Sequence, residues 1–223
     1  MSVWIRLFAY LHAIWFGEVS VQARGEQRRK TRERIIAAAT EAFALHGVHG
    51  TRIAEIAERA GIAYGLVYHH FRNKQEILLA IFAERWDIYV TYIESVRNLQ
   101  VPFEERMRRL VHFWIETFRH EPHVMAVIVN EVSRSYEFLE SHNIADVLRA
   151  FTSLEALIQD AVDAGEVRSD LDPQLATYAV LGAADMVLAG YVMGTLSRKA
   201  PADFVADEQQ MVELIVRGLK AGG

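Results

Sequence analysis

Two short helical segments that meet at a glycine constrain the fold of this chain more than any other feature. The first segment repeats apolar residues at helical spacing: Ile53, Ile56, Ala57 and Ala60. Gly61 follows, where a helix-ending turn needs a residue that tolerates positive φ. The second segment, residues 63–69, directs Val67 inward and leads to Phe71. The pattern predicts a helix-turn-helix, whose second helix fits the major groove of DNA.

The rest of the chain also has helical patterning. Ile35, Ile36, Ala39 and Phe43 recur at helical spacing and complete a three-helix core. No run between residues 24 and 221 alternates as a strand does. Longer helices are expected over residues 74–98, 103–120, 122–138, 142–164, 173–197 and 203–219. The sequence therefore predicts an all-α protein with a three-helix head (24–73) and a six-helix body (74–223).

Capping residues indicate where several of these helices begin. Thr51 is expected to cap the helix that starts near Ile53, and Asn73 with Glu76 forms a capping box. Asp172 precedes a proline at the first helical position. Asp203, shortly after Pro201, is expected to start the last helix.

Charge is divided unevenly along the chain. Residues 24–74 carry ten basic and five acidic residues, net +5, whereas residues 75–223 carry thirteen basic and twenty-three acidic residues, net −10. Since residues 1–23 are neutral, the sum is −5. A basic segment on an acidic remainder is typical of a polyanion-binding module, although a basic face without a partner remains an alternative. The absence of cysteine excludes disulfides and thiolate sites and favours a reducing, cytoplasmic location.

Residues 1–23 form an apolar extension to which the sequence assigns no role. The stretch from Met1 to Phe16 is interrupted only by Arg6 and His12 and is too short to span a bilayer, which needs about 20 apolar residues. Four interpretations stay open: an export signal cleaved after residues 21–23, a membrane-surface anchor, a helix packed on the domain, or translation from upstream of the true start.

The segment from Ile35 to Lys74 resembles the TetR family of transcriptional regulators. The matching residues are Ile35, Ala38, Ala39, Phe43, Gly47, Thr51, Ile56, Ala57, Ala60, Gly61, Gly65, Tyr68, His70, Phe71 and Lys74. One departure is Ala63, which stands where many relatives place a serine that caps the recognition helix. The resemblance implies a DNA-binding head and a body that dimerises and binds a small ligand.

The resemblance also implies roles for individual residues of the head. Phosphate contacts fall to Thr51, Tyr68, His70 and Lys74, with further attraction from Arg28, Arg29 and Lys30. Base reading falls to the start and exposed side of the recognition helix: Arg52, Ala63, Tyr64, Gly65, Leu66 and His69. For any single residue, a solvated surface position is the alternative.

Large apolar side chains in the body suggest a ligand pocket between helices. The candidates are Trp86, Tyr89, Phe113, Trp114, Met125, Tyr178 and Met186, although ordinary core packing would give the same pattern. Small residues along 173–197, including Gly182 and Gly190, suggest close approach by another helix or a ligand. By the resemblance, this helix and the last one form the interface of a homodimer, which implies a near-palindromic operator on double-stranded DNA.

The body further resembles the FadR-like, acyl-CoA-responsive branch of the family. A long-chain acyl-CoA needs an apolar tunnel with cations at its mouth, and Arg106, Arg109 and Arg134 are the candidate cations. Two alternatives stay open for them: a pair between Arg134 and Glu131, and a solvated helix start at 106–109. The resemblance implies a repressor released from DNA by such an effector, or by another hydrophobic molecule or drug in efflux control. No cofactor is expected.

Two functions of other classes remain as alternatives. An enzyme would need a nucleophile–base pair or a metal site, and the only candidate is the spacing of His112, Glu116 and His120 on one helix face, with His123 close behind. The interpretation favoured here is that the chain has no metal site and is not an enzyme. A membrane-attached binding protein would rest on residues 1–16 alone.

Overall fold

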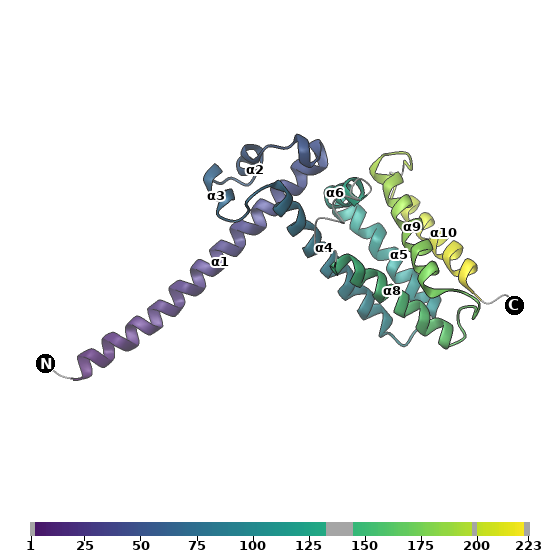
Figure 1. Ribbon diagram of the computed structural model, residues 1–223, viewed down its shortest axis with the longest axis horizontal. Coiled ribbons are helices and arrows are strands. Elements are labelled where there is room, and N and C mark those ends of the chain that lie inside the picture. The colour runs from purple at the N-terminus through teal and green to yellow at the C-terminus, as the bar shows by residue number, and fades with distance from the viewer. Residues whose placement is uncertain (1–2, 133–144, 198–199, 221–223) are drawn as a thin grey trace.

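A computed structural model describes the backbone of residues 3–132, 145–197 and 200–220, and the side chains of 25–130, 145, 148–197 and 200–220. The described residues contain helices and no strand, which confirms the all-α prediction. The helices are α1 (Val3–Gly50), α2 (Ile53–Arg59), α3 (Tyr64–Tyr68), α4 (Lys74–Arg97), α5 (Phe103–His120), α6 (Pro122–Val132), α8 (Ala145–Asp163), α9 (Pro173–Val192) and α10 (Pro201–Leu219). Helices α1–α3 gather at one end of the molecule and α5–α10 at the other (Figure 1).

Helix α1 is longer than the sequence suggested. It passes the expected boundary at residue 23 without interruption, and its N-terminal part projects away from the other helices (Figure 1). Near its other end the helical geometry breaks at Gly47, which has a φ of 69°. Only glycine adopts this conformation without strain, so Gly47 turns the chain toward α2.

The head core joins α1, α2 and α3 to α4 and α6. Ile35, Ile56 and Val67 are fully buried in it, as the helical spacing predicted. Residues 77–82 of α4 belong to the same core, whereas Val90 and Ile93 lie in the body core. The division between the two cores therefore falls within α4 and not at residue 73.

Helix α6 also belongs to both cores. Val127 is buried among head residues, whereas Met125 and Val129 are buried among body residues. Arg85 of α4 forms an ion pair of 2.5 Å with Glu121, which immediately precedes α6. Movement of α6 relative to the body would therefore displace residues of the head core.

Three predicted helix boundaries are confirmed by their caps. Gly61, with a φ of 62°, lies in the turn that ends α2. Asn73 Oδ1 accepts from Glu76 N at 2.8 Å at the start of α4, although the Glu76 carboxylate accepts from Arg72 N and not from Asn73 N. Asp172 caps α9, accepting from the backbone N–H groups of residues 174 and 175, with a proline next to it.

Other predicted boundaries are wrong. Arg52, not Thr51, is the N-cap of α2, because the Thr51 hydroxyl donates to the carbonyls of Ala42 (3.1 Å) and Gly47 (2.8 Å). Helix α10 begins at Pro201, with Asp203 accepting from the Ala200 N–H, two residues before the expected start. Helix α9 ends at Val192, and not at 197. The predicted segments 133–138 and 142–144 lie outside the described residues.

Replacing Gly61 with alanine is expected to lower the free energy of unfolding by about 1–2 kcal/mol, because a non-glycine residue pays this cost in the left-handed region. A Cβ at this position would also lie 3.0 Å from Arg34 Nη2, which donates to the carbonyls of Ala60 and Gly61. Urea denaturation measures the change.

Gly65→Ala is the matched control. Gly65 lies within α3, has no heavy atom within 4 Å of an added Cβ, and does not have a positive φ. Alanine there is expected to leave stability unchanged or raise it by about 0.5–1 kcal/mol. Equal destabilisation by both variants would contradict the assignment of Gly61 as the strained position.

Candidate nucleic-acid and effector sites

Helix α3 presents three large side chains to solvent. Tyr64 is 54% exposed, Leu66 37% and Tyr68 47%, whereas Val67 on the opposite side is fully buried in the head core. Gly65 and His69 are exposed as well. Ala63 is the N-cap residue of α3, and its side chain forms no capping hydrogen bond, as expected because alanine replaces the serine of many relatives. The predicted base-reading residues of α3 therefore share one accessible surface.

The head also carries exposed cations that are unpaired among the described residues. Arg28 and Arg52 are exposed, and neither side chain forms an ion pair or hydrogen bond with another described residue. Arg72, just after the recognition helix, is also exposed, and its guanidinium has no described partner. Arg72 was not among the predicted DNA-binding residues, although it lies between the predicted residues His70 and Lys74. Free guanidinium groups beside an exposed helix suit the phosphates of DNA.

The other predicted N-terminal cations already have partners. Arg29 contacts Glu33 and Lys30 contacts Glu26, each at 2.7 Å along α1. All four side chains are more than half exposed, so these pairs contribute little to stability and exchange readily for a phosphate.

Two predicted phosphate ligands have a structural role in the head. Thr51 is 1% exposed and its hydroxyl donates to two carbonyls, so it does not reach the surface in this structure. Lys74 Nζ donates to the carbonyls of His49 (3.0 Å) and Thr51 (2.7 Å). These contacts hold the loop between α1 and α2 against the start of α4.

The described structure places His70 beside several positive groups. Burial lowers the pKa of His70, and Arg28, His69 and Arg32 lower it further. His70 is therefore mostly neutral near pH 7 in the free protein. A phosphate at this position would reverse the electrostatic contribution and raise the pKa.

DNA binding is therefore expected to take up a proton at His70, and the affinity should increase about three- to tenfold from pH 8 to pH 6. Fluorescence anisotropy across this range measures the effect. His70→Gln should flatten the dependence, whereas His120→Gln, in the body, should leave it unchanged. An identical pH dependence in the His70 variant would contradict the assignment.

Five of the predicted ligand residues come together in the body. Tyr89 of α4 lies 5.7 Å from the Trp86 ring, and 6.1 Å from the rings of Phe113 and Trp114 on α5. Met125 of α6 belongs to the same core. Trp86 packs against both the head core and the body core. We call these five residues the aromatic cluster.

The aromatic cluster contains two buried donors without a hydrogen-bond acceptor in the described part of the chain: Trp86 Nε1 and Tyr89 Oη. Burial raises the pKa of the Tyr89 phenol, and the neighbouring Trp114 indole offsets this only in part. A buried donor without an acceptor costs about 1–3 kcal/mol. An occupant that offers an acceptor would remove that cost.

The predicted cations do not form a free binding site. Arg106 is 7% exposed and its Nη2 contacts Glu166 at 2.7 Å, so this prediction is wrong: the side chain joins α5 to the segment after α8. Arg109 is exposed and pairs with Glu105 at 2.9 Å. Arg134 lies outside the described residues.

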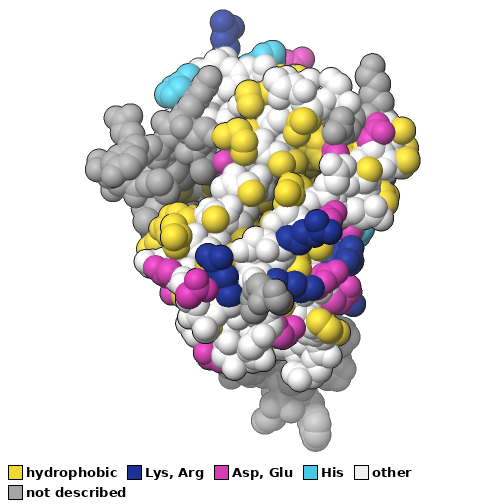
Figure 2. Space-filling model, turned by 90° about the vertical axis from the view of Figure 1, so that its right-hand side faces the viewer, with side chains coloured by type: hydrophobic (Ala, Val, Ile, Leu, Met, Phe, Trp, Pro, Cys, Tyr) yellow, Lys and Arg dark blue, Asp and Glu magenta, His cyan; other side chains and the backbone are white. Residues whose placement is uncertain are grey.

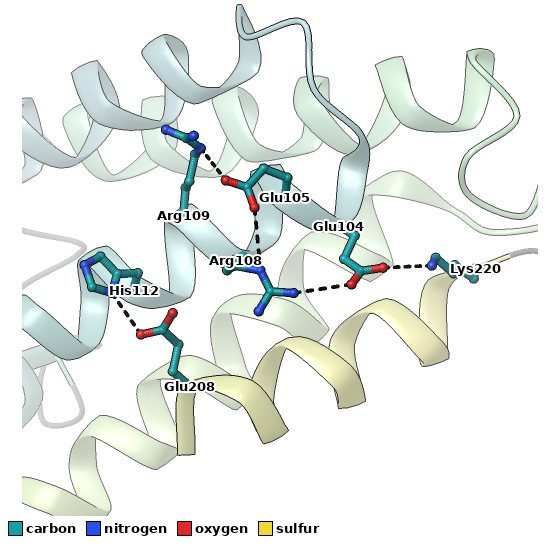
Figure 3. Close-up of polar contacts among 7 residues, drawn as sticks. All are labelled: Glu104, Glu105, Arg108, Arg109, His112, Glu208 and Lys220. Atoms are coloured by element: carbon teal, nitrogen blue, oxygen red, sulfur yellow. Dashed lines mark hydrogen bonds and ion pairs between the residues drawn. The ribbon is translucent and has the colours of Figure 1, made fainter. Parts of the chain in front are cut away.

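Figure 3 shows that the exposed arginines at the start of α5 are paired with carboxylates, so they do not form a free cationic entrance to a ligand tunnel. Two carboxylates interleave with its arginines: Arg108 contacts both Glu104 and Glu105, and Lys220, just past α10, contacts Glu104 at 2.9 Å. Lys220 also lowers the pKa of Glu104. The alternative of a solvated helix start therefore holds for Arg108 and Arg109, but not for the buried Arg106.

Two further ligand predictions are also wrong. Tyr178 and Met186 are 59% and 68% exposed on α9, so they do not line an internal pocket. With Leu175 of α9, Met193 just after α9, and Val205 and Leu214 of α10, they form an exposed apolar face. Figure 2 shows hydrophobic side chains gathered on this side of the molecule, with charged groups below them. We call these six residues the apolar face.

The apolar face explains the composition of α9. By length and apolarity alone the helix would suit a membrane span, but it packs against α5, α6 and α8 on one side. Gly182 lies open on the other side, whereas Gly190 is closely approached by Leu196 of the same chain. Helix α9 therefore has one side in the core and an apolar side exposed in the single chain.

The residues of α5 with a metal-like spacing form ordinary ion pairs. His112 Nδ1 contacts Glu208 of α10 at 2.8 Å, and His120 Nε2 contacts Glu116 at 3.1 Å (Figure 3 draws the first). Among the described side chains, no three metal-ligating groups converge. The helix face therefore gives no support to metal-dependent catalysis.

Comparison with known proteins agrees with this geometry. Residues 35–81 match the model of the bacterial regulatory proteins of the TetR family, and residues 82–218 match that of the YsiA-like C-terminal region. The fatty acid metabolism regulator protein of Bacillus subtilis is 26% identical over 197 residues, covering 87% of this chain and 98% of that protein.

Two solved structures are similar over most of their length. FadR of Bacillus subtilis in complex with stearoyl-CoA has a TM-score of 0.74 and 25% identity, covering 84% of this chain and 98% of that chain. SmeT, the repressor of a Stenotrophomonas maltophilia multidrug efflux pump, has a TM-score of 0.69 and 26% identity, covering 87% and 94%. The chain therefore belongs to the TetR family of bacterial transcriptional regulators.

Proposed function

We propose that the protein is a cytoplasmic homodimer that represses transcription from a near-palindromic operator and is released by a long-chain acyl-CoA. The observation that carries the DNA part is the exposed surface of α3, which presents aromatic and aliphatic side chains in a head that also carries the unpaired guanidinium groups of Arg28, Arg52 and Arg72. The arginines attract phosphates, and the α3 side chains meet base edges and the backbone.

The apolar face supports the dimer. Monomeric soluble proteins rarely expose large contiguous apolar surfaces, and two antiparallel helices with small residues between larger ones pack well against their own copy. A twofold axis there would place two α3 helices on one side of the dimer. Each would then read one half of the operator.

The aromatic cluster supports an amphiphilic effector. Trp86 Nε1 and Tyr89 Oη are donors inside an apolar environment, so they suit a ligand with a long hydrocarbon chain and a carbonyl group. The relative that binds stearoyl-CoA has the same family fold. Tyr92 connects Arg109 to the aromatic cluster: its ring stacks on Phe113 with centroids 4.4 Å apart, and its hydroxyl donates to the Arg109 carbonyl. Arg109 would have to leave Glu105 to reach a CoA phosphate.

Release of DNA follows from the position of the aromatic cluster between the two cores. An occupant between α4, α5 and α6 would favour a conformation in which α6 moves relative to the body. Because α6 contributes Val127 to the head core, the head would turn with it. The recognition helices of the dimer would then no longer match the half-site spacing.

The experiment begins with an operator selected by the protein from random duplex DNA. Its affinity is then measured with stearoyl-CoA, CoA and stearate. Stearoyl-CoA is expected to weaken binding about 5- to 150-fold, the range of typical allosteric coupling, whereas CoA leaves it unchanged. A complex that stays intact in saturating stearoyl-CoA would overturn the effector assignment.

A second candidate effector is a hydrophobic drug-like molecule, as in efflux control. The similarity to SmeT favours it, and so does the predominance of aromatic rings in the cluster. Triclosan, the ligand named for a SmeT complex, is the probe in the same assay. Release by triclosan without release by stearoyl-CoA would favour this second candidate.

A further inference from the structure

The two tyrosines of the recognition helix contact each other. Tyr64 and Tyr68 are one helical turn apart on α3, and their hydroxyl oxygens lie 3.0 Å apart. Their rings meet edge to face with centroids 5.4 Å apart. Neither hydroxyl bonds to any other described group, and both side chains are about half exposed. Each phenol therefore restrains the other at the DNA-facing surface.

A hydrogen bond between two phenols leaves one proton free. Either phenol can donate in this pair; when Tyr64 donates to Tyr68, Tyr68 keeps its own proton for an outside acceptor such as a phosphate oxygen. Accepting a hydrogen bond also strengthens the bond that a hydroxyl donates, because successive hydrogen bonds polarise one another. Tyr68 thus becomes a better and less mobile donor to a phosphate oxygen than a lone tyrosine would be.

We infer that Tyr64 is a positioning residue, which holds the Tyr68 hydroxyl toward the DNA backbone and does not read a base. This inference rests on the proposed DNA-binding function and replaces the base-reading role that the sequence suggested for Tyr64. Base discrimination then falls to Leu66, His69 and Arg52, whose side chains form no hydrogen bond with this pair.

The same hydrogen bond also has a spectroscopic signature. The bond with Tyr64 is the main cause of a raised pKa at Tyr68, with smaller contributions from burial and from the Tyr64 charge. This direction corresponds to Tyr68 donating to Tyr64 in the free protein, so the bond reverses when Tyr68 donates to a phosphate. Loss of the Tyr64 hydroxyl should therefore bring the Tyr68 pKa back toward that of an ordinary tyrosine. Spectrophotometric titration of the phenols detects this change without DNA.

A double-mutant cycle tests the inference. Wild type, Tyr64→Phe, Tyr68→Phe and the double variant are each titrated with the selected operator and with a random duplex. Tyr64→Phe is expected to weaken both DNAs by the same factor, about three- to tenfold, and to have no further effect in the Tyr68→Phe background. Tyr92→Phe, in the body, serves as the control for the loss of a phenol.

Each result has a distinct meaning. Additive effects of the two substitutions, or a loss confined to the operator, would overturn the positioning role of Tyr64. Leu66→Ala provides the contrast, since it should lower the ratio of operator to random affinity. If wild type itself fails to bind DNA, the proposed function fails, and this outcome is distinct from additivity in a protein that binds.

Discussion

Replacing Met186 and Leu214 with glutamate is expected to convert the proposed dimer to a monomer and to weaken operator binding by at least about a hundredfold. Both side chains are exposed in the isolated chain, at 68% and 74%, and lie at the apolar face. A buried, unpaired carboxylate at each position of a twofold interface costs several kcal/mol. Analytical ultracentrifugation measures the mass, and anisotropy measures the affinity.

Leu148→Glu is the matched control for this pair. Leu148 is 51% exposed on α8, and it is not part of the apolar face. The control should stay dimeric and bind the operator with wild-type affinity. A Met186/Leu214 variant that remains dimeric would show that the apolar face is not the interface between protomers.

Tyr89→Phe is expected to raise the stearoyl-CoA concentration needed for half-release of DNA by about tenfold, while operator affinity without effector stays the same. The substitution removes a hydroxyl that lacks a partner in the free protein and that the effector would satisfy. For the same reason the free energy of unfolding should stay constant or increase by about 1 kcal/mol. A release titration and urea denaturation measure the two effects.

Tyr92→Phe is the control that tests whether the effect belongs to the Tyr89 hydroxyl or to the loss of any phenol on α4. Tyr92 lies nearly one turn further along the helix and donates at 3.3 Å to the Arg109 carbonyl near the surface. Its loss should leave the effector response within about twofold of wild type. Equal loss of response in both variants would indicate that the Tyr89 hydroxyl has no specific role.

Local signals in the sequence predicted much of the head. The glycine turn at Gly61, the cap at Asn73 and the buried positions Ile35, Ile56 and Val67 depend on neighbours within a few residues, so their patterns determine their structure. The surface of α3 followed from the same periodicity. Arg72 was overlooked because nothing in its immediate sequence distinguishes a free arginine from a paired one.

The failed predictions depend on distant contacts. Arg106 was taken for a ligand cation because its partner, Glu166, is sixty residues away in the sequence. Thr51 is the exception: its acceptors, the carbonyls of Ala42 and Gly47, are only nine and four residues away, but the sequence does not distinguish a hydroxyl that donates back into α1 from one that caps α2. For Tyr178 and Met186, helical spacing identified an apolar side of α9, but spacing does not distinguish a ligand-binding side from an interface with another chain.

Salt dependence of operator binding tests the central claim most directly. If the α3 surface binds the DNA backbone through its arginines, affinity should fall about a hundredfold or more over a tenfold increase in salt, because counterions are released. Replacing Arg28 and Arg72 with glutamine should lower the slope of the logarithmic plot. An operator affinity that is unchanged over a tenfold increase in salt would contradict the account.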